Sequence, residues 1–396
     1  MIPLLRHSFN QQFRPDKYAG MLDRIEKEYP HMLDFRIAET PVFIPNVILR
    51  KMMDTCEYVI DRILSPTFKK LTAESIPEKF RIGGPEEYPQ FMVFDFGIFG
   101  TDSANAEPML IELQGFPSLL AYQSMLSELM RDYTHIPEQY SSYLNGYDAG
   151  SHQQLLKDII LGKEDPLSVI LLEILPEKQK TRIDFAITEK MLGIKTVCFS
   201  KIKREGNSLY YEWQGKKQKI SRIFNRMIFE DPFLIQYQDS INDLFTNTDL
   251  TWVSHPNWYY RISKYLLPFL DHPNIPASWF LDELKEMPRL SDHVLKPLYS
   301  FAGAGVNLDV KLEDIEKIEH PREWILQRKV NYLPVIQTPD EAAKLEIRLF
   351  YYWPKGMPRP IAIHNLARLS KGSMIGTRYN KDKDWVGGSI AFFEQP

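Results

Sequence analysis

The chain contains 396 residues, of which 44% are hydrophobic and 25% are charged. This composition excludes an intrinsically disordered chain, and the length predicts two or three domains. The formal charge of -4 excludes the basic footprint of a nucleic-acid-binding protein, and no stretch is long and apolar enough to span a bilayer. We expect no signal peptide, because the first residues lack its apolar core. With Cys56 and Cys198 as the only cysteines, a reducing compartment is expected, and hence a cytoplasmic protein that binds neither nucleic acid nor membrane.

Two amphipathic helices with a hairpin between them are predicted first along the chain. Apolar residues recur at helical spacing over residues 46–70 and 118–130. The segments "FMVFDFGIF" (91–99) and "PMLIELQGF" (108–116) are short, apolar and rich in strand-forming residues, and a polar connection joins them. This order predicts a β-hairpin between the two helices.

The hairpin carries two acidic residues at symmetric positions. Asp95 and Glu112 are equally distant from the centre of the connection, between Ser103 and Ala104, so a symmetric hairpin places them opposite each other. Like charges in this arrangement repel and favour a bound cation. Gln114 projects from the same face as Glu112, and oxygen ligands of this kind suit magnesium held jointly with nucleotide phosphates. In the alternative interpretation, the hairpin is not symmetric and one acid points to solvent.

Residues 165–255 are predicted to form a small Rossmann-like unit. A strand is expected over 167–175, a helix over 180–194 and a second strand over 195–200, which is the order of a β-α-β unit. A hairpin follows over 205–220, and another apolar run, "SRIFNRMIF", begins at Ser221. The chain is therefore expected to combine helices and strands in an α/β fold of the α+β kind.

Strands dominate the prediction for the rest of the chain. A helix is expected over 261–270, before a strand–loop–strand segment at 293–310. Further strands are predicted over 324–330 and 345–353, and the last segment, 360–393, is rich in strands. No internal repeat is recognisable.

A lysine inside an apolar run is the main candidate for a phosphate ligand. In "VLKPLYSFAGAG" (294–305), Lys296 is followed by a loop of small residues. A buried ammonium group requires an anion or loses its proton, and small residues let the backbone approach a ligand closely. Alternatively, the lysine reaches water from an edge strand and the glycines only form a turn. Lys264 is a second candidate, although a lysine on an amphipathic helix is usually solvated.

Two more strands carry candidates for nucleotide contacts. Glu346 and Arg348 share one face of the strand over 345–353, where the arginine could bind a phosphate or pair with a neighbouring acid. The strand in "ILQRKV" (325–330) could offer backbone groups to an adenine edge. The chain contains no zinc-ligand cluster, no serine-hydrolase elbow and no P-loop.

The order of these segments, over most of residues 90–390, resembles the synthetase part of glutathionylspermidine synthase and related, circularly permuted ATP-grasp ligases. The hairpin with its "FPSLL" ending resembles the metal segment of that family, which implies that Asp95, Glu112 and Gln114 bind magnesium. "WYYRISKYLLPFL" resembles the segment with the first ATP lysine, here Lys264.

The later segments of the chain extend this resemblance to the nucleotide. "VLKPLYSFAGAGV" resembles the strand and loop that hold the phosphates, and "WILQRKVNYLP" resembles the hinge beside adenine. "LARLSKGSMIGTRYNKDKDWVGGS" resembles the closing segment and supplies the catalytic candidate Arg368. The second catalytic candidate, Arg348, lies on the strand that carries Glu346. The resemblance thereby implies a set of ATP-binding residues: Lys264, Lys296, Ser300, Gly303, Gly305, Gln327, Lys329 and Val330.

The resemblance implies an ATP-grasp fold with an inserted Rossmann-like pre-ATP-grasp domain. Residues 1–160 would form the N-terminal part with the metal-binding hairpin, 161–255 the inserted domain and 256–396 the nucleotide-binding part. The implied activity is an ATP- and magnesium-dependent carboxylate–amine ligase that forms an acyl phosphate, with small-molecule or peptide carboxylates and amines as substrates.

The chain departs from the family pattern at three places. Val93 replaces an arginine, Gln114 replaces an asparagine, and "SFAGAG" (300–305) replaces a loop with two charged residues. Arg81 or Arg348 could substitute for the missing arginine. These departures motivate two alternatives: an ATP-binding protein without catalysis that regulates a partner, and a structural protein that has lost the nucleotide site.

Overall fold

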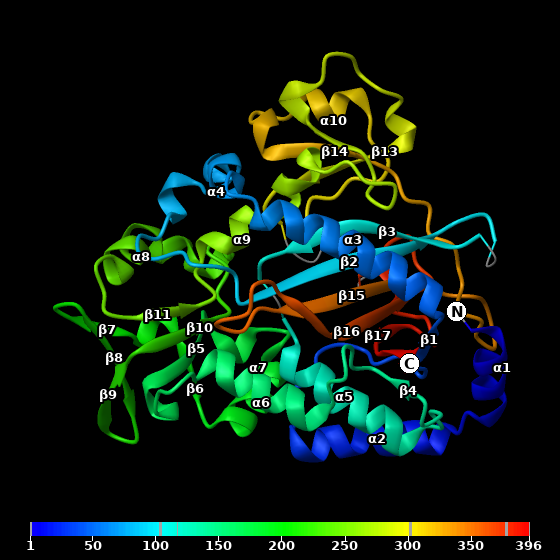
Figure 1. The fold of residues 1–396 in the computed structure, drawn as a ribbon, viewed down its shortest axis with the longest axis horizontal. Coiled ribbons are helices and arrows are strands. Elements are labelled where there is room, and N and C mark those ends of the chain that lie inside the picture. The colour runs from blue at the N-terminus through cyan, green and yellow to red at the C-terminus, as the bar shows by residue number, and fades with distance from the viewer. Residues whose placement is uncertain (1, 103–104, 117, 301–302, 377–378, 396) are drawn as a thin grey trace.

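A computed structural model describes residues 2–102, 105–116, 118–300, 303–376 and 379–395. At its centre is an antiparallel sheet of five strands, in the order β17-β16-β15-β2-β3. Two of its strands precede residue 115 and three follow residue 343, so both ends of the chain build one sheet (Figure 1). The strands are β2 (Phe91–Phe99), β3 (Glu107–Gln114), β15 (Lys344–Tyr352), β16 (Ile361–Ser370) and β17 (Gly387–Ser389).

Helix α3 (Asn46–Leu64) crosses one face of this sheet (Figure 1). Side chains alternate between the two faces of a strand, so Phe94 and Phe96 of β2 point to the core they share with α3, and Asp95 points to the opposite face. The helix ends six residues earlier than the sequence predicts, because Pro66 disfavours the helical conformation of the residue before it. A short helix, α4 (Phe68–Leu71), follows.

The second sheet is parallel and has the order β11-β10-β5-β6. The predicted strand–helix–strand order is present as β5 (Val169–Glu173), α7 (Arg182–Leu192) and β6 (Lys195–Cys198). The other two strands are β10 (Arg222–Asn225) and β11 (Thr251–Val253), and α8 (Gln238–Phe245) lies between them in sequence. The predicted hairpin forms a separate three-stranded sheet of β7 (Lys203–Glu205), β8 (Ser208–Trp213) and β9 (Lys216–Ile220).

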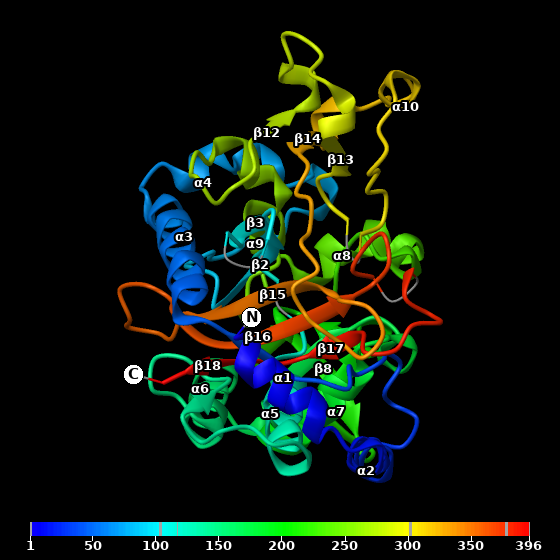
Figure 2. The ribbon, with the colours of Figure 1, turned by 90° about the vertical axis from the view of Figure 1, so that its right-hand side faces the viewer.

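The third unit lies beyond the β3 edge of the central sheet in both views and shares part of its hydrophobic core (Figures 1 and 2). It consists of an antiparallel sheet in the order β12-β14-β13 and of α10 (Leu312–Glu316). Its strands are β12 (Ser278–Phe280), β13 (His293–Pro297) and β14 (Trp324–Arg328). Only the first half of the predicted strand–loop–strand segment is a strand, since residue 307 makes a single bridge to Leu295 and the chain then turns away.

The predicted helix over 261–270 is replaced by two short turns of helix. The first is α9 (Asn257–Arg261), and the second is a 3-10 helix over Lys264–Phe269 that begins at a Ser263 cap. A continuous α-helix is disfavoured here because Pro268 has no N–H to donate and its ring collides with the preceding turn.

Helices α5 (Leu120–Tyr133) and α6 (Ala149–Ile160) pack against the other face of the central sheet, and the first and last segments of the chain pack against α5. A small sheet joins β1 (Val42–Ile44) to β18 (Ala391–Glu394) and β4 (Tyr140–Ser141). The helices of the first segment are α1 (Pro3–Gln12) and α2 (Pro15–Glu28). Among the residues that the structure describes, no helix has the length and apolarity that a bilayer crossing requires. The domain boundaries near residues 160 and 255 stay predictions.

Candidate nucleotide-binding site

The hairpin of β2 and β3 places its two acids directly opposite each other. The register pairs Asp95 with Glu112 and Val93 with Gln114, as the symmetric hairpin predicts, and an irregularity follows Asp95. The centre of the connection, Ser103 and Ala104, lies outside the described residues. The pairing brings two carboxylates to one position on the face of the sheet, where they require positive charge nearby.

Asp95 receives its positive charge from two arginines of the same sheet. Arg348 lies opposite Asp95 in the register of β15 and β2, and its guanidinium group binds both carboxylate oxygens at 2.6 Å. Arg368 of β16 adds a contact of 3.2 Å to Oδ2. Burial by itself would raise the pKa of Asp95, but the attraction of Arg348 outweighs it and holds the pKa below its ordinary value.

A third acid, Glu346, extends this cluster along the sheet. Arg368 lies opposite Glu346 in the register and forms an ion pair with it, while the hydroxyl of Tyr332 donates to its Oε2 at 2.9 Å. The ring of Tyr332 lies over Gly97, where a Cβ atom would come within 2.6 Å of the ring. Glycine at this position of β2 therefore allows the tyrosine to reach the acid.

Two lysines contact β3. Lys264 begins the 3-10 helix that ends at Phe269, and Lys296 lies on β13 of the third unit. Lys264 donates to Glu112 Oε1 at 2.9 Å and to the carbonyl of Ser300 at 3.0 Å. Lys296 of β13 donates to the carbonyl of Ile111 at 3.1 Å and to Gln327 Oε1 at 2.6 Å. Both lysines thus meet β3, although they belong to different elements.

Burial lowers the pKa of Lys296 to about 8, although Glu112 acts in the opposite direction. For Glu112 itself, burial raises the pKa, but Lys264 outweighs this effect and the net shift is downward. The site therefore favours charged carboxylates and holds a lysine whose charge changes near neutral pH.

The other candidates for ATP binding lie on β14 and on the loop after β13. Gln327 is buried in β14, and its Nε2 atom, like Oγ of Ser300, has no hydrogen-bond partner within the described part of the chain. Gly303 and Gly305 both have positive φ angles, +71° and +72°, while residues 301–302 of the same loop are not described. Both atoms lie beside the two lysines, and buried polar atoms of this kind usually have a hydrogen-bond partner.

Two candidates near the end of β14 lie toward the surface. Lys329 donates to the carbonyl of Ser291 at 3.0 Å, and Val330 is half-buried just beyond the strand. Arg81, considered as a substitute for the missing arginine, donates to the carbonyls of Ala73 and Ile76 and therefore belongs to that segment. Roles for these residues in ATP binding stay predictions, as do those of the other site residues.

The sequence analysis did not identify Tyr332 or assign a role to Glu346. Glu346 sits in the charged cluster because strands β2, β15 and β16 are adjacent, and Tyr332 because it forms a bridge with Phe99 at the end of β2. The one usable signal in the sequence was that Glu346 and Arg348 share a strand face. Nothing in the spacing of Tyr332 connects it to Gly97.

The described side chains do not fit the predicted magnesium site. Both oxygens of Asp95 are bound by Arg348, and one oxygen of Glu112 is bound by Lys264. In the part of the chain that the structure describes, no group of three or more His, Cys, Asp or Glu side chains is arranged to hold a metal. Gln114 is half-buried beside this pair. Magnesium prefers several oxygen ligands that are not shared with guanidinium groups.

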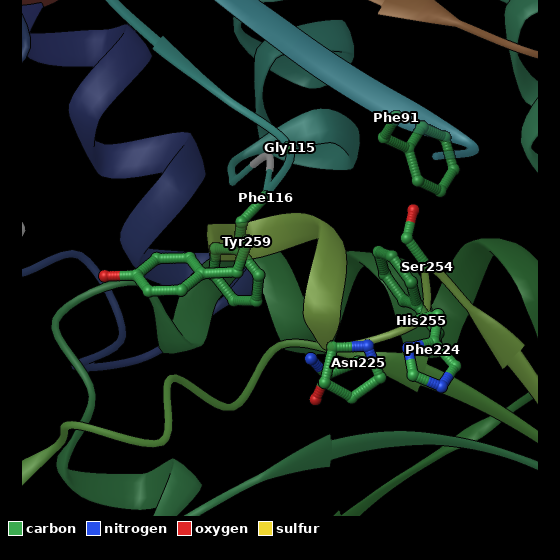
Figure 3. A pocket seen from close by; sticks show the side chains of 9 residues that line it. Phe91, Gly115, Phe116, Phe224, Asn225, Ser254, His255 and Tyr259 are labelled. Atoms are coloured by element: carbon green, nitrogen blue, oxygen red, sulfur yellow. The ribbon is translucent and has the colours of Figure 1, made fainter. Parts of the chain in front are cut away.

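A small pocket lies where the central sheet meets the parallel sheet (Figure 3). Gly115 and Phe116 follow β3, and Asn225 and Ser254 lie at the carboxyl ends of β10 and β11. A Cβ atom on Gly115 would come within 2.4 Å of the Trp258 carbonyl oxygen, so a glycine is required for this close approach. The amide of Gly115 donates to the Ile262 carbonyl at 2.7 Å, which ties β3 to the segment that carries Lys264.

Comparisons with known proteins identify the fold. No family model and no curated protein sequence matches the chain. Among solved structures, the chain is similar to that of a glutathione synthetase-like effector from Globodera pallida in its apo form. The match has a TM-score of 0.56 and 9% sequence identity, and it covers 97% of this chain and 98% of that chain. It confirms the resemblance drawn from the motifs at the level of the fold: the chain has a mixed α/β fold similar to that of the glutathione synthetase-like effector.

Proposed function

We propose that the chain binds ATP and joins a carboxylate to an amine through an acyl-phosphate intermediate. The main support is the convergence of Lys264 and Lys296 on β3, beside atoms of Ser300 and Gln327 that have no hydrogen-bond partner among the described residues. Two ammonium groups and two unpaired polar groups at one place suit the phosphates and the base of a nucleotide. The substrates are proposed to be small-molecule or peptide carboxylates and amines, and the free thiols of both cysteines agree with a cytoplasmic location.

The cationic side chains would stabilise the transfer of the γ-phosphoryl group. An oxygen of the substrate carboxylate attacks the phosphorus, the bond to the β-phosphate oxygen breaks, and ADP leaves. Negative charge grows on the bridging oxygen during this step, and Lys264, Lys296 and Arg368 are the cations proposed to neutralise it. The amine nitrogen then attacks the acyl carbon and the bond to phosphate breaks. The proton of the nitrogen leaves with the phosphate, and an amide remains.

We propose that the substrate acid, which accepts the phosphoryl group, binds at the pocket of Figure 3, whose cavity has room for about one water and would widen to admit the acid. Ligands of open α/β sheets bind beyond the carboxyl ends of the parallel strands, which is where Asn225 and Ser254 lie. The pocket also adjoins Gly115, the residue after the acidic strand β3. A substrate in this position would reach the nucleotide across the end of β3.

A second candidate function is nucleotide binding without catalysis, through which the chain would regulate a partner. Val93 in place of an arginine and the uncharged loop after β13 favour it. The ion pair of Asp95 with Arg348 adds to this argument, because it occupies an acid that the family uses for metal.

Trapping of the acyl phosphate separates the two candidates. The chain is incubated with ATP, pools of carboxylic acids and peptides, and hydroxylamine as a general amine acceptor. The ligase forms hydroxamate and ADP in equal amounts, whereas a regulator binds ATP and releases no ADP. A lack of ATP binding would contradict both. Asn225→Asp, which places a negative charge in the pocket of Figure 3, is expected to raise the KM for the acid with less effect on ATP binding.

The affinity for ATP is expected to fall as the pH rises above about 8, where Lys296 loses its charge in the free protein. The protonated lysine attracts the triphosphate and the neutral one does not, so the dissociation constant rises with pH, by at most about tenfold per unit. Isothermal titration calorimetry between about pH 7.5 and 9.5 measures this slope. The same slope in Lys296→Met would show that another group is responsible.

A further inference from the structure

The charged cluster on the central sheet holds more cations than carboxylates. Four cationic side chains, from Lys264, Lys296, Arg348 and Arg368, meet three acids, Asp95, Glu112 and Glu346. A site built for a divalent cation has the opposite balance, since excess carboxylates attract the metal. The cluster is instead suited to binding an anion directly, without a metal ion between the anion and the side chains.

The side chain of Arg348 is held in place by its buried position in the sheet. Arg348 lies directly opposite Asp95 in the sheet, where it is 7% exposed and its partner 1%. The guanidinium group binds the carboxylate with two parallel bonds of 2.6 Å. Removing one partner from a buried pair of this kind is strongly destabilising, so a metal would have to displace a firmly held arginine.

Arg368 is the member of the cluster that can reach a ligand. Its side chain bridges Asp95 and Glu346 and is 33% exposed, and its Nε atom has no hydrogen-bond partner among the described residues. A guanidinium group of this kind can bind phosphate oxygens without leaving the cluster entirely. Arg368, Lys264 and Lys296 together offer a bound anion three positive charges from three different elements of the fold.

We infer that Arg348 and Arg368 take the place of the divalent cation, so that the site binds a nucleoside triphosphate without magnesium. The inference rests on the proposed function, since it concerns the same nucleotide site. Arg348 neutralises Asp95 permanently, which removes the repulsion between this acid and the phosphates. Lys264, Lys296 and Arg368 then supply the charge that a metal would supply.

The test compares ATP binding by the full chain in EDTA and in excess magnesium. Calorimetry is expected to give dissociation constants that agree within about threefold, and thermal unfolding is expected to show the same upward shift with ATP in both buffers. If ATP binds about tenfold or more tightly with magnesium, the inference is wrong but the proposed function stands. If ATP does not bind in either buffer, the proposed function itself fails.

Two variants sharpen this test. Arg348→Met leaves Asp95 with only the 3.2 Å contact of Arg368, so ATP binding in EDTA is expected to weaken about tenfold or more and to recover in part with magnesium. The double variant Asp95→Asn/Arg348→Met removes both charges and keeps the cluster balanced, so its ATP binding is expected to be independent of magnesium again. A magnesium requirement in this double variant would overturn the inference, and it decides the question even if the single variant does not fold.

Arg359→Met is the matched control. Arg359 also pairs with acids, Glu57 and Asp61, but its side chain is 41% exposed and lies outside the cluster. This variant is expected to bind ATP like the unmodified chain in both buffers. A magnesium requirement in it would show that the loss of any arginine produces the effect, which would also overturn the inference.

Discussion

Replacing Asp184 by alanine is expected to lower the free energy of unfolding by about 3–5 kcal/mol, because the change leaves a buried arginine without its partner. Asp184, on α7, is 1% exposed, and its Oδ2 atom accepts a bond of 2.6 Å from Arg226. The same carboxylate accepts the backbone amides of Leu119, Ala121 and Tyr122 at 3.0 to 3.1 Å. It therefore caps α5 from a different helix, and α5 has no capping side chain of its own.

Urea denaturation followed by circular dichroism measures this loss. Asp16→Ala provides the control, since Asp16 also pairs with an arginine, Arg14, but in solvent, and its loss is expected to change stability little. Asp184→Asn keeps the shape and removes the charge, so it is expected to lie between the two. A loss below about 1 kcal/mol for Asp184→Ala would contradict the importance of the pair.

Replacing Lys296 by methionine is expected to weaken ATP binding by about 30-fold or more, which corresponds to the 2–5 kcal/mol typical of a buried charge contact. Methionine keeps the length of the side chain but removes the charge that faces the triphosphate. The folded state is expected to persist, because burial already works against the charged lysine. Calorimetry measures the affinity, and circular dichroism checks that the variant is folded.

Lys217→Met is the control for this prediction. Lys217 lies on β9, in the separate hairpin sheet, and pairs with Glu205 in solvent. Its replacement is expected to leave the affinity for ATP unchanged. Equal losses in both variants would indicate a general charge effect, and an unchanged affinity in Lys296→Met would mean that the nucleotide binds elsewhere.

The amino-acid sequence was sufficient for the local features of this protein. The two short, apolar, strand-prone runs and the polar connection between them predicted the hairpin and the pairing of Asp95 with Glu112, because register in a hairpin is set by nearby residues. The order of strand, helix and strand in residues 167–200 was also predictable. Pro66 ended α3 early, and Pro268 lies inside the 3-10 helix over Lys264–Phe269, where it disfavours an α-helix. Both effects are local as well, although the helical spacing alone did not show them.

Only the tertiary structure decided what the acids of the hairpin contact. Asp95 and Arg348 are 253 positions apart, and they meet because β2 and β15 are neighbours in the central sheet. From the sequence, two opposed carboxylates indicated a metal, since nothing in the spacing shows that a distant strand supplies the neutralising charge. The cap of α5 by Asp184 is hidden for the same reason. Short-range periodicity determines strands and turns, whereas contacts between distant charges depend on which strands become neighbours in the folded sheet.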